Sequence, residues 1–219
     1  MKDTITRYHY RGSLTKEYCD ADLSAAISCC TVGAQSLIDN GKAMTIALYH
    51  HKHMLFLYVE AIGEECRPED FCSALKPYMQ LWPGIEKNRV WADMYHIYYH
   101  AVPESIEDWK RTTKPALQRG RIAFLYPGKL YSYIHHHLAI VREGLLSGDK
   151  YQSIALHENI LFSYFEEPKT MINIRRDSSL TSEAIKEWMA VDPESHFMHQ
   201  PECKGANFMF LPAYFVVQL

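Results

Sequence analysis

Apolar and polar residues follow the same pattern in two stretches of the chain, residues 41–60 and 148–166. Each stretch has two runs rich in β-branched and aromatic residues around a short polar turn, a pattern typical of a β-hairpin. We place a two-residue gap in the turn, because a change of length is tolerated best there. Eight positions then agree: Lys42, Ile46, Ala47, Leu48, Leu55, Phe56, Tyr58 and Glu60 match Lys150, Ile154, Ala155, Leu156, Leu161, Phe162, Tyr164 and Glu166. A period of about a hundred residues is too long for a solenoid repeat and predicts a duplicated small domain.

The other predicted elements follow the same order in both halves. The first half reads as strand 4–10, helix 20–39, hairpin 43–60, helix 68–81 and strand 91–100. The second half reads as strand 121–126, helix 129–147, hairpin 150–166, helix 180–191 and strand 207–217. The second helices also align without a gap, ALKPYM at 74–79 against AIKEWM at 184–189. Residues 103–120 are polar, contain two prolines and end in glycine, which indicates a linker.

The order βαββαβ is the ferredoxin-like plan. We therefore predict an α+β protein of two tandem ferredoxin-like repeats, with repeat 1 at 1–102, the linker at 103–120 and repeat 2 at 121–219. A ferredoxin-like sheet has helices on one face only, so its other face needs a cover. The two sheets are expected to pack face to face as an intramolecular dimeric α+β barrel-like pair, and a further homodimer remains open.

Composition narrows the class of protein. Of the 219 residues 47% are apolar and 22% charged, which is ordinary for a globular protein. The net charge of −3, without a Lys/Arg run, argues against nucleic-acid binding. Neither a signal peptide nor a stretch of ~20 apolar residues is evident, so we expect a cytoplasmic protein with no membrane partner. The six cysteines contain no CxxC pair and read as small buried hydrophobes.

The helix at 129–147 carries the first candidate for chemistry. Helical spacing places Tyr133 and His137 one turn apart on one line, where both can contact one ligand. A histidine on an apolar helix face is more often a core residue. However, the positions of the first copy at the same offset are Ala25 and Cys29, so packing alone does not demand this pair. Trp188 aligns with Tyr78 and adds an aromatic side chain to each copy.

A zinc site formed by His135, His136 and His137 is not expected. Consecutive helical residues point about 100° apart and do not converge on one ion. His50, His51 and His53 lie in a predicted turn, where exposure to solvent is the simpler interpretation. Glycine-rich phosphate loops, nucleophile elbows and HExxH are absent from the sequence. We therefore predict no metal.

The second copy resembles the L-rhamnose mutarotase family. The resemblance rests on RIAFLY at 121–126, the Tyr133-xxx-His137 helix continuing LAIVREGLL, the hairpin SIALHENILFSYFE at 153–166 and the helix that bears Trp188. It covers the second copy nearly end to end, and the first copy mainly in its hairpin and second helix. The resemblance implies an isomerase that interconverts the anomers of a 6-deoxy or related sugar by general acid–base catalysis, without a cofactor.

By the same resemblance, His137 is the catalytic acid and Tyr133 and Trp188 bind the sugar. The family's second tryptophan is Met189 here, and its hairpin tyrosine falls on Gln152, or on Tyr151 if the alignment shifts by one. Two alternatives stay open. One is a non-catalytic carbohydrate-binding or regulatory protein on the same fold. The other is a cofactor-free monooxygenase-like enzyme that acts on a hydrophobic aromatic. Polar groups converging on a pocket at His137 would favour a sugar, and a dry, deep pocket would favour the monooxygenase.

Overall fold

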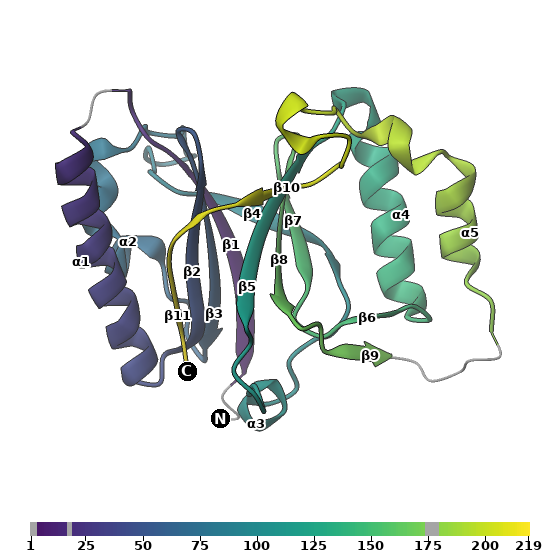
Figure 1. Cartoon of the computed structure of the whole chain (residues 1–219), viewed down its shortest axis with the longest axis horizontal. Helices are drawn as coiled ribbons and strands as arrows, with labels where there is room; N and C mark the ends of the chain where they lie inside the picture. Colours follow the sequence, from purple (N-terminus) through teal and green to yellow (C-terminus); the bar gives the residue numbers. More distant parts are fainter. Residues whose placement is uncertain (1–3, 17–18, 174–179) are drawn as a thin grey trace. The chain divides into compact units, whose positions relative to one another are not determined.

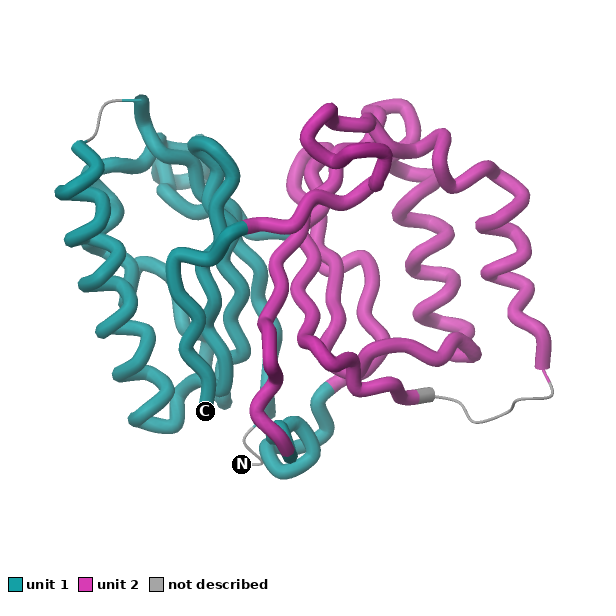
Figure 2. Tube along the Cα trace, viewed as in Figure 1, with its two compact units in different colours: residues 1–94, 103–112, 212–219 teal, residues 95–102, 113–211 magenta. Residues whose placement is uncertain are grey.

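The computed structural model describes residues 4–16, 19–173 and 180–219. The chain forms two compact units, shown in teal and magenta in Figure 2. Unit 1 contains residues 1–94, 103–112 and 212–219, and unit 2 contains residues 95–102 and 113–211. Each unit therefore combines segments that are distant in sequence.

Unit 1 is an antiparallel sheet with α1 packed against it (Figure 1). Its elements are β1 (Ile5–Ser13), α1 (Asp20–Asp39), β2 (Ala43–His51), β3 (Met54–Ile62), the short helix α2 (Pro68–Phe71), a 3-10 turn (Ser73–Tyr78), α3 (Ile106–Trp109) and β11 (Ala213–Gln218). β3 pairs with both β1 and β2, and β11 pairs with the free edge of β2. The helix predicted at 20–39 is confirmed.

One face of α1 supplies the core of unit 1. Its buried residues recur at helical spacing and pack with the apolar residues of β2 and β3: Leu23, Ala26, Cys30, Ala34 and Ile38. Among the described residues, α1 is long and apolar enough to cross a membrane by length and composition. One face of α1 packs in the core of unit 1, and most of its other residues are exposed.

Both predicted hairpins form, and both have tight turns of two residues. His51 pairs with Met54 across Lys52 and His53, and His157 pairs with Ile160 across Glu158 and Asn159. The predicted position of the two-residue gap is therefore wrong. The turns are equally long, and the difference in length lies in the strands, since β2 has 9 residues and its counterpart β7 has 5.

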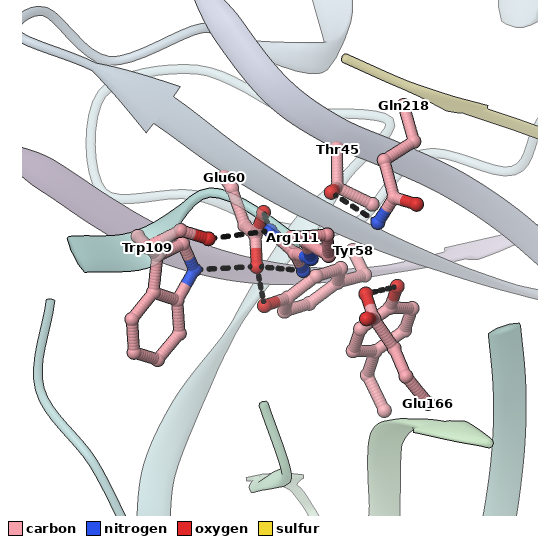
Figure 3. Close-up of polar contacts among 8 residues, drawn as sticks. Thr45, Tyr58, Glu60, Trp109, Arg111, Glu166 and Gln218 are labelled. Atoms are coloured by element: carbon pink, nitrogen blue, oxygen red, sulfur yellow. Dashed lines mark hydrogen bonds and ion pairs between the residues drawn. The ribbon is translucent and has the colours of Figure 1, made fainter. Parts of the chain in front are cut away.

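Residues 103–112, within the predicted linker, are anchored to the sheet of unit 1. The fully buried carboxylate of Glu60 accepts hydrogen bonds from Trp109 Nε1 at 2.9 Å and from both terminal nitrogens of Arg111 at 2.7 and 2.8 Å (Figure 3). Tyr58 donates a further bond to Glu60 at 2.7 Å. This bidentate pairing, with every donor buried, fixes the segment on β3.

Unit 2 is built around a second hairpin and two helices. Its elements are β5 (Leu117–Phe124), a 3-10 turn (Pro127–Lys129), α4 (Leu130–Glu143), β6 (Ser147–Asp149), β7 (Ser153–His157), β8 (Ile160–Glu167), β9 (Met171–Asn173), α5 (Glu183–Ala190), the 3-10 turns Pro193–His196 and Pro201–Cys203, and β10 (Met209–Leu211). β8 pairs with β5 and β7, and β10 with β5. β6 and β9 form a separate two-stranded ladder. In Figure 1, α4 and α5 lie side by side.

The predicted fold class, two ferredoxin-like repeats whose separate sheets form an intramolecular pair, is wrong. The strands instead form one nine-stranded antiparallel sheet in the order β10-β5-β8-β7-β4-β1-β3-β2-β11. β4 (Ala92–Tyr99) joins the two ladders, because its first residues pair with β1 and its last with β7. A strand shared in this way does not end a self-contained repeat.

Two prolines explain two further differences from the predicted elements. The strand predicted at 207–217 is divided by Pro212 into β10, which pairs with β5, and β11, which pairs with β2. Proline has no N–H to donate to a ladder and favours such a break. The helix predicted at 68–81 is reduced to α2 and a 3-10 turn that contains Pro77. A proline inside a helix removes a backbone hydrogen bond and clashes with the preceding turn.

Candidate active site

α4 supplies the central residues of the candidate site. It ends at Gly144, which adopts the left-handed conformation with φ 65°, where glycine carries no steric penalty. Tyr133, His136 and Ile140 are its buried residues, at the spacing of one helical face. Ser132 on the same helix bonds His196 Nε2 at 2.9 Å. The helix is therefore fixed from both its buried face and its first turn.

His137 is held by Tyr133 in two ways. Their rings stack with centroids 3.8 Å apart and planes inclined by 19°. His137 Nδ1 also lies 2.9 Å from the carbonyl oxygen of Tyr133. A carbonyl only accepts hydrogen bonds, so Nδ1 carries the hydrogen, and in the neutral ring Nε2 carries the lone pair. Within the described part of the chain this Nε2 makes no hydrogen bond, so it is available to accept a proton from a ligand.

Two more aromatic side chains enclose the His137 ring. Trp188 from α5 lies at a centroid distance of 5.0 Å and Tyr98 from β4 at 5.8 Å, both edge-on, at 73° and 79°. Trp188 also meets Tyr133 at 90°, with centroids 5.6 Å apart. We call Tyr98, Tyr133, His137 and Trp188 the ring cluster. Its contacts are aromatic edges and faces, and Tyr98, Tyr133 and Trp188 also pack in the hydrophobic core of unit 2.

The position of Trp188 follows from how α5 is capped. The Glu143 carboxylate accepts bonds from the backbone nitrogens of Glu183 at 2.9 Å and Ala184 at 3.2 Å, and a short one from the Ser182 hydroxyl. Hydrogen bonding from Ser182 lowers the pKa of Glu143, so the group is anionic at the helix N-terminus. On the other side of Trp188, the fully buried His196 packs with ring centroids 4.8 Å apart. α5 is thereby fixed on α4.

Burial sets the ionisation of the ring cluster. It lowers the pKa of His137 to about 4, against the opposing hydrogen bond to the Tyr133 carbonyl, and His136 and His196 add to the lowering. Burial also raises the pKa of Tyr98 and Tyr133. At neutral pH the ring cluster therefore contains a neutral imidazole and two neutral phenols.

Arg121 on β5 brings a positive charge beside the ring cluster. Its guanidinium lies between Phe208 at 4.3 Å and Phe165 at 4.9 Å, and its Nε donates to Ser163 Oγ at 3.4 Å. Burial lowers the pKa of Arg121, while the nearby Tyr133 opposes that effect. Within residues 4–16, 19–173 and 180–219 no carboxylate forms an ion pair with Arg121. A largely buried cation of this kind favours an anionic ligand or a developing negative charge.

The structure brings together three of the predicted site residues, namely Tyr133, His137 and Trp188. Met189 is 64% exposed. Tyr151 and Gln152 belong to a turn organised by Asp149, whose carboxylate accepts from the Tyr151 nitrogen and whose carbonyl accepts from that of Gln152.

In the first copy, Ala25 and Cys29 are exposed on α1. The buried positions of that helix, Ala26 and Cys30, are one residue further along the chain. Neither residue can act as Tyr133 and His137 do, so α1 carries no Tyr/His pair at the matching positions.

Comparison with known proteins gives few relatives. No family model matches the chain, and no curated protein does. Among solved structures, a putative monooxygenase from Lactobacillus acidophilus NCFM has a TM-score of 0.44 at 9% identity, covering 99% of this chain and 97% of that one. A putative monooxygenase from Fusobacterium nucleatum subsp. nucleatum gives 0.40 at 9% identity, covering 100% and 96%. An anthrone oxidase-like protein gives 0.37 at 8% identity, covering 99% and 92%.

These findings correct the resemblance to L-rhamnose mutarotase. No family model or curated protein supports it, and the structural neighbours are putative monooxygenases. The identification, together with the isomerase activity and the 6-deoxy sugar that it implied, is therefore wrong. The resemblance rested on the order and spacing of several motifs, and no single one of them is specific to that family.

Three residues of the site were not found by sequence reasoning, namely Tyr98, Arg121 and His196. Tyr98 reaches the ring cluster from β4 and His196 from the 3-10 turn Pro193–His196, both distant in sequence from α4. Arg121 stands directly before the apolar run IAFLY, where its charge gave no signal of a site. A charged residue at this position points to a site only once the side chains around it are known.

Proposed function

We propose that this protein is a cofactor-free monooxygenase-like enzyme that oxidises an electron-rich aromatic compound at the ring cluster of unit 2. The observation that carries the proposal is the setting of His137. Its Nε2 carries a lone pair and is enclosed by the rings of Tyr98, Tyr133 and Trp188. A base enclosed by aromatic rings suits an apolar substrate that loses one proton.

The proposed substrate is a flat aromatic molecule with an acidic C–H group next to a ring carbonyl. Edges and faces of the ring cluster would pack on its aromatic surface, where aromatic pairs gain about 0.5–1.5 kcal/mol beyond the area that they bury. A sugar would require several polar side chains aimed at one point. The described contacts of His137 contain one hydrogen bond, and that bond goes to the backbone.

The first chemical step is removal of the C–H proton by His137 Nε2. The electron pair of the broken C–H bond moves into the ring system and places negative charge on the carbonyl oxygen. Arg121, whose charge has no carboxylate partner among the described residues, stabilises that oxygen. The anion in turn favours the protonated imidazole, which offsets the burial that holds the pKa of His137 low.

The second step uses molecular oxygen as the oxidant. The substrate anion passes one electron to O2, and the two radicals combine to form a C–O bond. The imidazolium of His137 returns its proton to the terminal oxygen, which gives a hydroperoxide. Loss of water then breaks the O–O bond and leaves a carbonyl, so that CH2 plus O2 becomes C=O plus H2O. One oxygen atom enters the product, the other enters water, and His137 is regenerated.

The test is oxygen uptake by the protein with a tricyclic aromatic ketone of this type, in buffer with EDTA and without flavin. We expect stimulated uptake and, with ¹⁸O2, one labelled oxygen in the product. His137→Gln should lower the rate by about 10²–10⁴-fold, the usual value of general base catalysis. The matched control is Cys29→Ala, an exposed position on α1 that should leave the rate unchanged.

The variant Arg121→Met tests the effect of the Arg121 charge separately from the packing of its side chain. A methionine can still fill the space between Phe165 and Phe208, so the fold should survive while the rate falls. Substrate binding without oxygen uptake in the unmodified protein would overturn the proposal in favour of a binding protein. An unchanged rate in His137→Gln would remove the ring cluster from the reaction.

A cytoplasmic location is proposed with this function. Its support is the state of the cysteines, since all six are free thiols. Free thiols on a protein surface, such as those of Cys19 and Cys29, persist best in a reducing compartment. Fractionation of the native cell, with a compartment marker, tests the location.

A further inference from the structure

Two histidines of α4 and one glutamate of α5 form a second cluster, which does not include His137. His135, His136 and Glu187 each offer one potential ligand atom, and these atoms lie within 4.8 Å of one another. His135 and Glu187 are exposed, and His136 is buried. The cluster therefore has open access on one side and protein on the other.

His136 gives a second, independent indication of a ligand. Its side chain is only 8% exposed, and its Nδ1 is buried without a hydrogen-bond partner among the described residues. The ring is held between His135 at 5.1 Å and Trp188 at 5.5 Å. A buried imidazole nitrogen normally has a partner, and an unpartnered one in a native structure requires an explanation. A bound cation would supply that partner.

We propose that His135, His136 and Glu187 form a binding site for a divalent transition metal of the zinc type. Two imidazole nitrogens and one carboxylate are a ligand set that zinc accepts, with a fourth position left for water. Calcium and magnesium select oxygen ligands and are disfavoured here. The site is distinct from the proposed oxidation reaction and does not depend on it.

The distances are compatible with binding after small side-chain movements. Zinc–nitrogen bonds of about 2.0–2.1 Å place two ligand atoms of a tetrahedral site roughly 3.3 Å apart. The present limit of 4.8 Å thus requires a closure of roughly 1.5 Å. His135 and Glu187 are exposed and free to rotate toward His136. The helices themselves need not move, because Glu143 already fixes the start of α5.

The objection raised by the sequence is answered by the second helix. The angle of about 100° between consecutive helical side chains keeps three histidines in a row from meeting at one ion. The ligand atoms of His135 and His136 nevertheless lie within 4.8 Å of each other, so these two can share an ion that a third residue completes. Glu187 supplies that third ligand from α5, and no spacing within α4 could have revealed it. A metal there would join α4 to α5 one residue before Trp188, and so would brace the wall of the ring cluster.

The test measures Zn²⁺ binding to the untagged full-length protein by competition with a chromogenic chelator. We expect one ion per chain, and at least about tenfold weaker binding in Glu187→Gln, His135→Ala and His136→Gln, because even outer residues of metal sites change affinity by about 10–100-fold. His199→Ala and Glu183→Gln are matched controls, because both are exposed residues outside the cluster. These controls should bind zinc as the unmodified protein does.

A second measurement protects the test against misfolding. Zinc should raise the thermal unfolding midpoint of the unmodified protein and of both controls, but not that of Glu187→Gln, whose exposed side chain is not needed for folding. Equal zinc affinity in the unmodified protein and Glu187→Gln would overturn the site, as would an equal loss in His199→Ala.

Discussion

The imidazole of His137 lies nearly parallel to the ring of Tyr133, with centroids 3.8 Å apart. The same residue fixes the tautomer of His137 through its backbone carbonyl. Tyr133 therefore sets both the plane of the imidazole and the nitrogen that carries its lone pair. The side chain governs the first of these effects and the backbone the second, so the two can be separated by substitution.

The stacking of Tyr133 on His137 predicts that two substitutions of Tyr133 lower the free energy of unfolding by different amounts. The side chain is 1% exposed, so Tyr133→Ala should leave a cavity and lower the free energy of unfolding by about 3–5 kcal/mol. Tyr133→Phe keeps the ring and should cost less than about 1.5 kcal/mol. Urea unfolding followed by circular dichroism checks both values. Equal losses in the two variants would mean that the hydroxyl, and not the stacked ring, is what the site requires.

Local patterns in the sequence predicted much of the secondary structure. The periodicity of 20–39 and the turn residues of the two hairpins located α1 and the strands β2, β3, β7 and β8. Helical spacing was enough to place Tyr133 beside His137. These features depend on residues within about one turn or one hairpin of each other, and such contacts leave a periodic signal.

Features that depend on distant partners were not predicted. The sharing of β4 between β1 and β7 requires pairing with segments on both sides in the sequence. Arg121 gained significance only from Phe165 and Phe208, which lie 44 and 87 positions away along the chain. Likewise, Glu187 meets His136 through the docking of two helices. A single sequence holds no periodic record of such contacts, and that is where a family resemblance can mislead.

The two hairpins repeat one hydrogen bond, and its loss should cost the same in each unit. Tyr58 donates to Glu60 at 2.7 Å, and Tyr164 donates to Glu166 at 2.8 Å (Figure 3 shows Glu60 and Glu166). All four side chains are buried, and bonds to charged groups contribute about 1.5–3 kcal/mol. Tyr58→Phe and Tyr164→Phe should each lower the free energy of unfolding by about that amount.

Urea denaturation of the two tyrosine variants and of the double variant is the measurement. Losses that add within about 0.5 kcal/mol would show that the two bonds act independently, and a larger deviation would show that they are coupled. If Tyr58→Phe lowers the free energy of unfolding and Tyr164→Phe does not, the repeated Tyr–Glu bond stabilises unit 1 alone.

Gly33 is predicted to be required for the close approach of α1 to α2. A Cβ added there would lie 2.9 Å from the carbonyl oxygen of Phe71 and 3.2 Å from its Cβ. The backbone oxygen cannot rotate away, so Gly33→Ala should destabilise the protein by about 1–3 kcal/mol through overpacking. Alanine gains about 1 kcal/mol of helix propensity over glycine, which reduces that loss. Gly128→Ala, where no heavy atom lies within 4 Å, is the matched control.

Thermal unfolding distinguishes these two glycine variants. Gly33→Ala should unfold at a lower temperature than the unmodified protein, and Gly128→Ala at nearly the same temperature. A midpoint of Gly33→Ala above that of the unmodified protein would mean that helix propensity outweighs the contact with Phe71.

The buried pair of Glu60 and Arg111 predicts a loss of stability as large as that of Tyr133→Ala. Their side chains are 0% and 5% exposed. Glu60→Gln would remove the carboxylate that the Arg111 guanidinium contacts, and breaking a buried pair in this way costs about 3–5 kcal/mol. Replacing both, as in Glu60→Gln with Arg111→Met, should recover part of the loss, because an apolar side chain needs no counter-charge. A double variant less stable than Glu60→Gln would contradict this account.

The same pair predicts how stability depends on pH. Burial acts to raise the pKa of Glu60, but the charge of Arg111 and the bonds from Arg111, Trp109 and Tyr58 outweigh it and hold the pKa below its usual value. The folded state therefore binds the proton more weakly than the unfolded chain. The contribution of Glu60 is present above the unfolded pKa of about 4.3 and is lost as the pH falls through the lower, folded value. Urea unfolding at pH 7 and at a series of values below pH 4 should show the difference between the unmodified protein and Glu60→Gln shrinking with acid. A difference that stays constant across this range would mean that Glu60 stabilises the fold by shape and not by charge.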